Sequence, residues 1–238
     1  MGQLPTHHLC SEVSCLLYFP GCMAEQRVKE VYEATLAVLE AAGLRVEVAE
    51  GWRCCGSVLY RLGDLKAFRR LAEYNSKLLS GGEVVTSCAG CYRAFRVDYP
   101  AIGVKPPRVR HTVEVLAEAY EREALELPEL GCTIAYHHPC HLARHCGVYE
   151  EPVMLLEAMG RVVESSLACC GAGGGFRALH PEESAKVADL LLRDLLSHNP
   201  DYVATSCPFC LLQLREAAKR AGYSTKVVDV TQLIAEHM

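Results

Sequence analysis

Ten of the fourteen cysteines in this sequence form two copies of one spaced pattern, and clustered thiols are strong ligands for metal ions. Each copy has a single cysteine, then Cys-Cys-Gly, then a C-x-x-C pair. The first copy comprises Cys22, Cys54, Cys55, Cys88 and Cys91, and the second comprises Cys140, Cys169, Cys170, Cys207 and Cys210. Equivalent groups lie 118, 115 and 119 residues apart in the same order, which indicates an internal duplication.

We expect these cysteines to be metal-binding thiols rather than disulfides. Residues 1–13 lack a basic segment followed by an apolar stretch, so no secretory signal is predicted. The apolar window at 15–23 is shorter than the roughly 20 residues that span a bilayer. The expected location is therefore the cytoplasm, where disulfides are rare. A disulfide between adjacent cysteines would also be strained.

The number of ligands separates zinc from iron–sulfur chemistry. A structural zinc site takes four ligands, commonly two closely spaced pairs. Each copy here offers five cysteines and a single C-x-x-C, which overfills a zinc site but suits a cluster of several irons. We predict iron–sulfur clusters, with zinc as the alternative. Packing as small apolar side chains would explain one or two cysteines but not a duplicated array.

The bulk composition is that of an ordinary globular protein. The chain has 238 residues, 50% of them hydrophobic, which is enough for a core that needs no disulfide staples. The net charge is −5, and no run of Lys and Arg provides the electrostatic footprint of a nucleic-acid binder. We therefore expect no nucleic-acid partner.

Short apolar strands alternate with amphipathic helices in both halves of the sequence. The first half predicts strands at 16–19, 45–48, 83–86 and 109–111, and helices at 24–42, 65–79 and 112–123. The second half predicts strands at 133–136, 161–165, 202–205 and 227–228, and helices at 152–159, 182–196, from 208 and from 231.

This alternation predicts an α/β fold with parallel sheets built from βαβ units. Two pseudo-symmetric halves are expected, each a small, mostly parallel sheet flanked by helices. Residues 1–14 form an N-terminal extension, 15–127 the first half and 128–238 the second half. Each cysteine group follows a strand and precedes a helix, at the sheet edge where functional loops collect. Three such loops can bring five sulfurs together, and helix N-termini favour thiolates and anionic sulfides.

The spaced cysteines resemble the cysteine-rich CCG domain of heterodisulfide reductase, in its B subunit and in the catalytic part of its D subunit. The resemblance extends from Cys15 onward, and its specific segments are 136–145, 147–152, 169–175 and 207–210. Relatives include iron–sulfur subunits of systems that oxidise lactate, glycolate or glycerol-3-phosphate. The 28-residue gap before Cys169 is shorter than is usual in the family, a departure in the loop that leads into that site.

The resemblance implies that each five-cysteine set binds a noncubane four-iron four-sulfur cluster. It also implies that a disulfide is reduced, or formed, in one-electron steps between the two clusters. D-type relatives often carry a ferredoxin segment of the C-x₂-C-x₂-C-x₃-C-P kind, and this sequence has none. No G-x-G-x-x-G follows a strand, so neither flavin nor NAD is expected on this chain.

Electrons are therefore expected from a partner, in the first place a ferredoxin-like iron–sulfur subunit that acts as donor or acceptor. A flavin-containing or membrane-associated subunit is a further expected partner, and membrane contact is expected only through it. Cleavage of a disulfide also consumes protons, and His138 and His141, which flank Cys140, are the predicted donors. The alternative is that these two, like His137 and His145 nearby, only shape the loop by hydrogen bonding.

The remaining cysteines have weaker assignments. Cys132 and Cys146 are expected to pack in the core, with Cys146 as a candidate for lining the site. A metal clip formed by His7, His8, Cys10 and Cys15 is weighed against a loosely placed terminus, which we favour.

Three functions fit these residues. The first is disulfide reduction or formation between two clusters. The second is electron transfer in a lactate, glycolate, glycerol-3-phosphate or succinate dehydrogenase-type complex. The third is a structural or assembly role with one cluster or none. Two complete cysteine sets favour the first. We therefore expect an oxidoreductase that acts on a sulfur group and is active within a complex.

Overall fold

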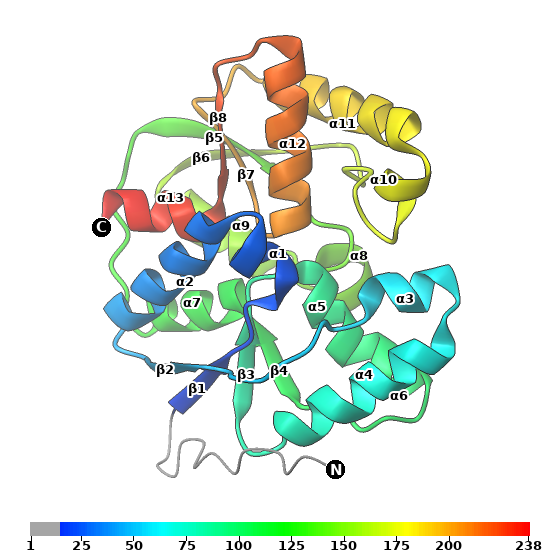
Figure 1. Cartoon of the computed structure of the whole chain (residues 1–238). Helices are drawn as coiled ribbons and strands as arrows, with labels where there is room; N and C mark the ends of the chain where they lie inside the picture. The colour runs from blue at the N-terminus through cyan, green and yellow to red at the C-terminus, as the bar shows by residue number, and fades with distance from the viewer. Residues whose placement is uncertain (1–14) are drawn as a thin grey trace.

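The computed structural model describes residues 15–238, which form two halves stacked one above the other (Figure 1). The first sheet contains β1 (Cys15–Tyr18), β2 (Arg45–Val48), β3 (Glu83–Thr86) and β4 (Arg108–His111). The second contains β5 (Cys132–His137), β6 (Gly160–Glu164), β7 (Tyr202–Thr205) and β8 (Lys226–Asp229). Their orders, β2-β1-β3-β4 and β6-β5-β7-β8, are equivalent, and every pairing is parallel. The predicted duplicated α/β fold is confirmed.

Helices connect the strands in the same scheme in both halves. The first half contains α1 (Gly21–Gln26), α2 (Lys29–Ala41), α3 (Ser57–Leu62), α4 (Leu65–Leu78), α5 (Ala89–Arg93), the π-helical segment η1 (Ala94–Asp98), α6 (Tyr99–Ala101) and α7 (Thr112–Glu121). The second contains α8 (Ala143–Cys146), α9 (Glu150–Glu157), α10 (Phe176–Leu179), α11 (Pro181–Leu196), α12 (Pro208–Ala221) and α13 (Val230–His237).

The single helix predicted at 24–42 is wrong, because the segment forms two helices, α1 and α2. The chain leaves helical geometry at Val28, whose backbone has φ −135° and ψ 64°. The Val28 side chain is buried in the core, so packing of this residue outweighs the helical periodicity of the sequence. The break separates α1, which carries Cys22, from α2.

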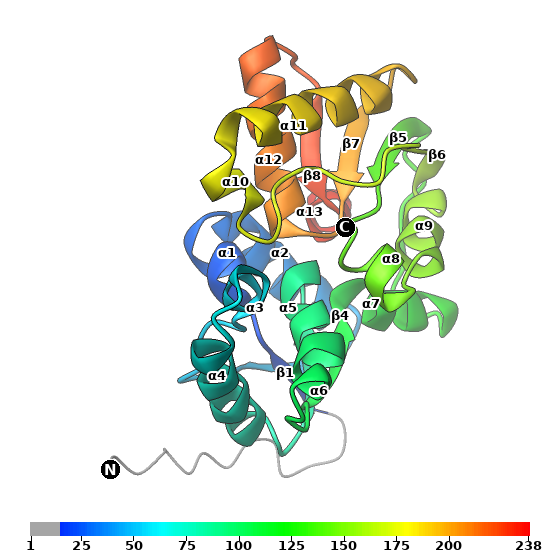
Figure 2. The same cartoon turned by 90° about the vertical axis from the view of Figure 1, so that its right-hand side faces the viewer.

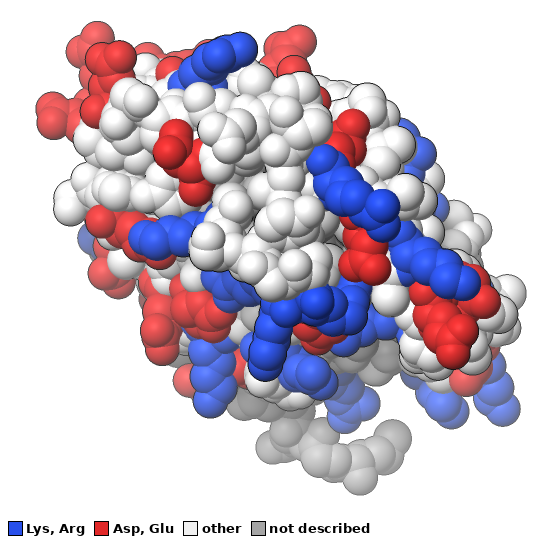
Figure 3. Space-filling view, turned by 90° about the horizontal axis from the view of Figure 1, so that it is seen from above, with Lys and Arg blue, Asp and Glu red and all other residues white. Residues whose placement is uncertain are grey.

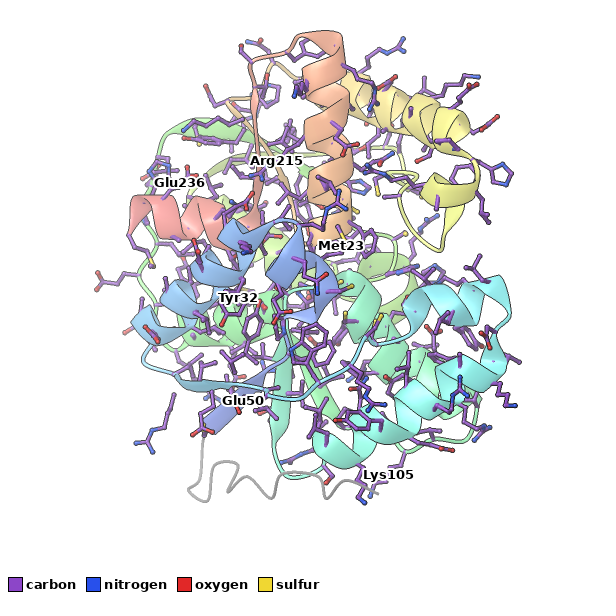
Figure 4. All side chains as sticks on the ribbon, viewed as in Figure 1. Met23, Tyr32, Glu50, Lys105, Arg215 and Glu236 are labelled. Atoms are coloured by element: carbon purple, nitrogen blue, oxygen red, sulfur yellow. The ribbon has the colours of Figure 1, made fainter. Side chains whose placement is uncertain are left out.

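Two equivalent helix pairs join the halves. α2 packs against α13, and α7 packs against α9. α2 and α9 connect the first two strands of their sheets, and α7 and α13 follow the last strands, so the two contacts are related by a pseudo-two-fold axis. At the first contact Arg215 of α12 forms an ion pair with Glu30 of α2, and Figure 4 shows Arg215 on the side of α12 that faces β8.

The last helix of each half starts with a capping box. In α7 the ring nitrogen Nδ1 of His111 accepts the amide N–H of Val113 at 3.4 Å. In α13 the Oδ1 atom of Asp229 accepts the amide N–H of Thr231 at 3.0 Å. His111 and Asp229 end β4 and β8 and are both buried, so these equivalent positions carry different ionisable groups.

The outer surface mixes charges of both signs. On the face seen from above, Lys and Arg side chains are interspersed with Asp and Glu around an uncharged area (Figure 3). Within residues 15–238, no helix combines the length and apolar character needed to cross a bilayer.

Candidate metal centre

The carboxyl ends of the strands of both sheets point toward the middle of the molecule (Figure 2), and each group of patterned cysteines follows one of these ends in the sequence. Five of these cysteines lie in irregular segments between a strand and a helix: Cys54, Cys55, Cys140, Cys169 and Cys170. Others lie at helix starts rather than in the predicted loops. Cys88 and Cys207 are the N-cap residues of α5 and α12, and Cys22, Cys91 and Cys210 belong to the first turns of α1, α5 and α12.

Nine of these ten cysteines line one cavity of about 640 Å³, its open mouth included. From the first half they are Cys22, Cys54, Cys55, Cys88 and Cys91, and from the second Cys140, Cys170, Cys207 and Cys210. Figure 4 shows sulfur atoms grouped between the lower end of α12 and α5. Cys169, which does not line this cavity, shares a hydrogen bond with Cys140, which does. The two cysteine sets therefore face a common space.

Thiol contacts connect the sulfurs within each half and across the halves. In the first half Cys22 contacts Cys54, and Cys91 contacts both Cys55 and Cys88. In the second half Cys210 contacts both Cys170 and Cys207, and the Sγ atoms of Cys170 and Cys210 are 3.1 Å apart. One contact crosses between the halves, because Cys88 shares a hydrogen bond with Cys207.

Equivalent thiols in the two halves are predisposed to ionise. A hydrogen bond from Cys22 lowers the pKa of Cys54 to about 2. In the same way, a hydrogen bond from Cys140 lowers the pKa of Cys169 to about 5. The amide N–H groups of Gly56 and Gly171 point at these two sulfurs, each at 3.4 Å. Thiolates are the metal-binding form of cysteine, so each half presents a sulfur ready to bind a cation.

Glycines leave room around the sulfurs. Gly21 has φ +70°, and a Cβ atom added there would lie 2.8 Å from the Sγ atom of Cys91. A Cβ atom on Gly90 would lie 3.7 Å from the Sγ atom of Cys88 and 3.7 Å from Nδ1 of His141. Any side chain at either position would enter the space between the thiols, so this space suits a bulky inorganic group.

Buried polar side chains hold the Cys-Cys segments in place. In the first half the Asn75 side chain accepts the Arg53 N–H at 3.0 Å and donates to the carbonyls of Arg53 and Cys54 at 2.9 and 3.2 Å. The Tyr99 hydroxyl donates to the Cys55 carbonyl at 3.1 Å. In the second half Ser184 donates to the Gly171 carbonyl at 2.8 Å. The two halves thus fix equivalent segments with different side chains.

We expect Asn75→Ala to destabilise the protein by about 2 to 3 kcal/mol, because the buried Asn75 side chain loses three hydrogen bonds to the Arg53–Cys54 backbone. Urea unfolding of the metal-free, reduced protein measures this change. Ser80→Ala serves as the control, since the Ser80 hydroxyl donates to an exposed carbonyl at the end of α4 and should change stability by less than about 0.5 kcal/mol. Equal stability of Asn75→Ala and wild type would contradict the support role.

A positively charged cluster lies beside the cavity. Arg61 contacts Asp98 at 2.9 Å, and Arg93 contacts the same carboxylate at 3.6 Å. The Asp98 side chain is only 2% exposed. Two guanidinium groups that share one carboxylate leave an excess positive charge, which favours anions such as thiolates and sulfide nearby.

The structure separates the two histidines that were predicted as proton donors. His141 lines the cavity, and burial, followed by the charge of Arg61, lowers its pKa to about 4. His138 is absent from the described residues that line the cavity. Its Nε2 atom hydrogen-bonds Glu164, and its ring packs against Tyr136 and Tyr149. Of the two, His141 therefore has the position that a proton donor to the cavity requires.

His137, which the sequence does not favour over its neighbours, lies beside two sulfurs of the second half. It is fully buried at the end of β5, and one of its ring nitrogens lies within 4.8 Å of the Sγ atoms of Cys170 and Cys210. Comparison of the two halves is the signal that could have identified it, because Phe19 occupies the equivalent position after Tyr18.

Two of the cysteines outside the pattern, Cys132 and Cys146, lie away from the cavity. Cys132 begins β5 opposite Gly160 of β6, and its Sγ atom packs so closely there that a Cβ atom on Gly160 would lie only 3.1 Å from it. Cys146 ends α8, and burial raises its pKa to about 11. Neither is among the residues lining the cavity. His7, His8 and Cys10 of the considered metal clip lie outside the described residues.

A family model for the cysteine-rich domain CCG matches residues 16–96 and again residues 134–215. The chain belongs to the CCG cysteine-rich domain family. Both matches begin at the first strand of a sheet and extend into the helix that carries the C-x-x-C pair or follows it. The predicted resemblance to this family is confirmed.

Curated relatives of this CCG protein are components of redox systems. It is 34% identical to the D subunit of dihydromethanophenazine:CoB–CoM heterodisulfide reductase from Methanosarcina acetivorans, over 99% of this chain and 62% of the relative. It is 33% identical to the B subunit of fumarate reductase (CoM/CoB) from Methanothermobacter marburgensis, over 91% and 45%. It is 32% identical to EtfAB:quinone oxidoreductase of Syntrophomonas wolfei, over 93% and 34%. The chain thus spans less than two thirds of each relative.

Among solved structures, a hypothetical protein from Helicobacter pylori is similar in fold. The TM-score is 0.70 at 11% sequence identity, with 94% of this chain and 49% of that chain covered. At this level of identity the similarity concerns the arrangement of the two sheets alone.

Proposed function

We propose that this CCG protein binds two iron–sulfur clusters and works as a redox component of a larger complex. The observation that supports the proposal best is the convergence of both cysteine sets on one cavity. Five sulfurs per half exceed the four of a zinc site. The ligands would be Cys22, Cys54, Cys55, Cys88 and Cys91 for one cluster, and Cys140, Cys169, Cys170, Cys207 and Cys210 for the other. We propose noncubane four-iron four-sulfur clusters, as the family resemblance implies.

When bound, such clusters supply single electrons at a potential set by their ligands and surroundings. The protein does the rest. Buried Cys55, Cys88 and Cys207 keep water from the inner side of the site. The excess positive charge of Arg61 and Arg93 around Asp98 favours a negatively charged site.

As the specific reaction we propose the reduction of a disulfide at the cavity, or its reverse. The sulfur–sulfur bond breaks, and each sulfur takes one electron and one proton, so two electrons and two protons yield two thiols. A partner supplies the electrons. His141 is the candidate to relay protons, because its ring lies in the cavity wall; with a pKa of about 4 the ring is neutral near pH 7, so it would pass on protons taken from water.

One observation favours a second function, the relay of electrons without substrate chemistry in this chain. Apart from cysteines, Ser57 and His141 are the polar side chains that line the cavity in the described part of the chain. A polar substrate would find few hydrogen-bonding groups there. The contact between Cys88 and Cys207 also brings the two sets together, as a short electron path requires.

We further propose that electrons reach the chain from a ferredoxin-like iron–sulfur unit in the cytoplasm, within a complex. The relatives that match here extend well beyond the matched region, which leaves room for such a unit in them. A flavin-containing or membrane-associated subunit would be a second partner, and this chain itself would bind neither flavin nor NAD.

Metal and sulfide analysis tests the proposal. Protein prepared without oxygen should contain about eight irons and about eight acid-labile sulfides per chain, the content of two four-iron clusters. Zinc in place of iron, with no sulfide, would refute it. Electron paramagnetic resonance after oxidation in the presence of a thiol then separates the two functions. A new signal that depends on the thiol indicates substrate chemistry, and an unchanged spectrum indicates electron relay.

A further inference from the structure

The two halves match closely at the end of their first strands, except at one buried position. Tyr18 of β1 hydrogen-bonds Ser87 through its hydroxyl at 2.9 Å, and Tyr136 of β5 hydrogen-bonds Ser206 in the same way at 3.0 Å. The residue after Tyr18 is Phe19, and the residue after Tyr136 is His137. Both are completely buried. The halves therefore differ in chemistry where their backbones and neighbours agree.

Phe19 places an apolar ring beside the first cysteine set. Its ring packs edge-on against Phe95 and Trp52. Atom Cε1 of this ring lies 3.7 Å from the place where a Cβ atom on Gly21 would be, and the Sγ atom of Cys91 lies 2.8 Å from the same place. The ring thus lies beside Cys91 but has no N–H to offer the sulfur.

His137 lies in the matching place beside the second set, and its ring carries two polar nitrogen atoms. One ring nitrogen is within 4.8 Å of the Sγ atoms of both Cys170 and Cys210. Neither ring nitrogen has a hydrogen-bond partner of good geometry among the described residues. The backbone is fixed, because the His137 carbonyl accepts the Thr205 hydroxyl at 3.1 Å within the β5–β7 pairing. A buried imidazole N–H is costly to leave unpaired, and the Cys170 sulfur is close enough to interact with the ring, so a sulfur acceptor is expected when the site is loaded.

We propose that His137 donates an N–H hydrogen bond to sulfur at Cys170 and Cys210, and that this makes the second cluster easier to reduce than the first. The inference rests on the proposed function, because it requires a cluster in each half. A hydrogen bond to a ligand sulfur stabilises the more negative, reduced state and raises the reduction potential. Electrons that enter the pair then settle in the second half. His137 acts through the sulfurs and is a positioning residue, not a catalytic one.

Substitution of the two equivalent positions tests the inference in the full chain with its clusters. His137→Phe gives the second half the residue of the first, and Phe19→His makes the reciprocal change. His137→Gln is the conservative variant, since it retains an N–H donor. Iron and sulfide are counted first, and each variant is then titrated from oxidised to reduced while the resonance signals of the two clusters are followed.

We expect His137→Phe to keep its iron, to shift one of the two reduction steps to lower potential and to leave the other in place. His137→Gln should retain most of the wild-type difference, and Phe19→His should shift the other step upward. In the wild type, transfer to heavy water should remove the coupling of one exchangeable proton from the cluster spectrum. His137→Phe should lack this coupling already in ordinary water. That readout is insensitive to a purely structural role.

Other outcomes would overturn the inference. Unmoved reduction steps in a fully loaded His137→Phe protein would exclude the hydrogen bond. Loss of about half the iron in this variant would make His137 a ligand instead of a donor. A wild-type protein without iron and sulfide would refute the proposed function and the inference with it, whereas the first two outcomes leave the proposed function intact.

Discussion

The substitution Cys55→Ser is expected to lower the iron content from about eight to about four per chain, with the second cluster retained. Cys55 is buried at 5% exposure, contacts Cys91 and Cys54, and has its carbonyl fixed by Tyr99. A serine hydroxyl is a poor ligand for iron compared with a thiolate, and the buried position gives water no way to replace the sulfur. Iron and acid-labile sulfide determinations on protein prepared without oxygen measure the loss.

The matched variant is Cys170→Ser in the second half, at 3% exposure, which should lose the other cluster to the same extent. The resonance spectra of the two variants should be complementary and add up to that of the wild type. Cys132→Ser is the control outside the pattern and should keep all its iron. Loss of all iron from either single variant would mean that the two sets share one site, and full retention would remove the residue from the ligand set.

We expect the wild-type protein to lose stability as the pH rises from about 4 to about 7, and the substitution Asp229→Asn to abolish most of this loss. Burial raises the pKa of the Asp229 carboxyl from 3.8 to about 7, against the hydrogen bonds from Thr231, and negative charge at Cys207 adds to the shift. The folded protein therefore keeps a proton that the unfolded chain releases. The contribution of this group to the free energy of unfolding is fully present below about pH 4 and falls by up to about 4 kcal/mol as the pH rises through this window.

The Asp229→Asn variant would keep the acceptor for the Thr231 N–H but would not titrate at this position, because Asn and Asp are both good N-cap residues. Urea unfolding of the metal-free, reduced protein at several pH values between 4 and 8 measures the difference. Asp201→Asn is the matched control, since this exposed carboxylate also accepts a backbone N–H, from Thr133 at 2.8 Å. The same pH slope in Asp229→Asn and in wild type would show that this carboxyl is not the cause.

Local patterns in the sequence were sufficient to predict most strands. β2, β3 and β7 have the predicted bounds, because short apolar or alternating runs bounded by turn residues leave few alternatives. The division of 21–41 into α1 and α2 was not predictable, since it depends on how Val28 packs in the core. The π-helical turn at 94–98 also has no local signal, and it brings Asp98 to Arg61 and Arg93.

For the candidate site, the spacing of the cysteines predicted two sets but could not predict that they contact each other. The Cys88–Cys207 contact depends on how the halves pack, through α2 with α13 and α7 with α9, and no short-range pattern encodes that packing. The same limit applied to the histidines. His137 and His138 are neighbours in sequence, but their rings point in different directions, as the side chains of successive strand residues do. Closeness to Cys140 in the sequence therefore did not identify which ring faces the sulfurs.

The pseudo-two-fold contact between the halves has a consequence for how such a site can diversify. An isologous homodimer of one half would bury the same helix pairs and enclose the same cavity, but every substitution would then occur twice. In a single chain each position can change alone. Phe19 and His137, or His111 and Asp229, are pairs in which that freedom has been used. Fusion of the two copies thus allows the two halves of the site to differ from each other, which a symmetric assembly of identical halves excludes.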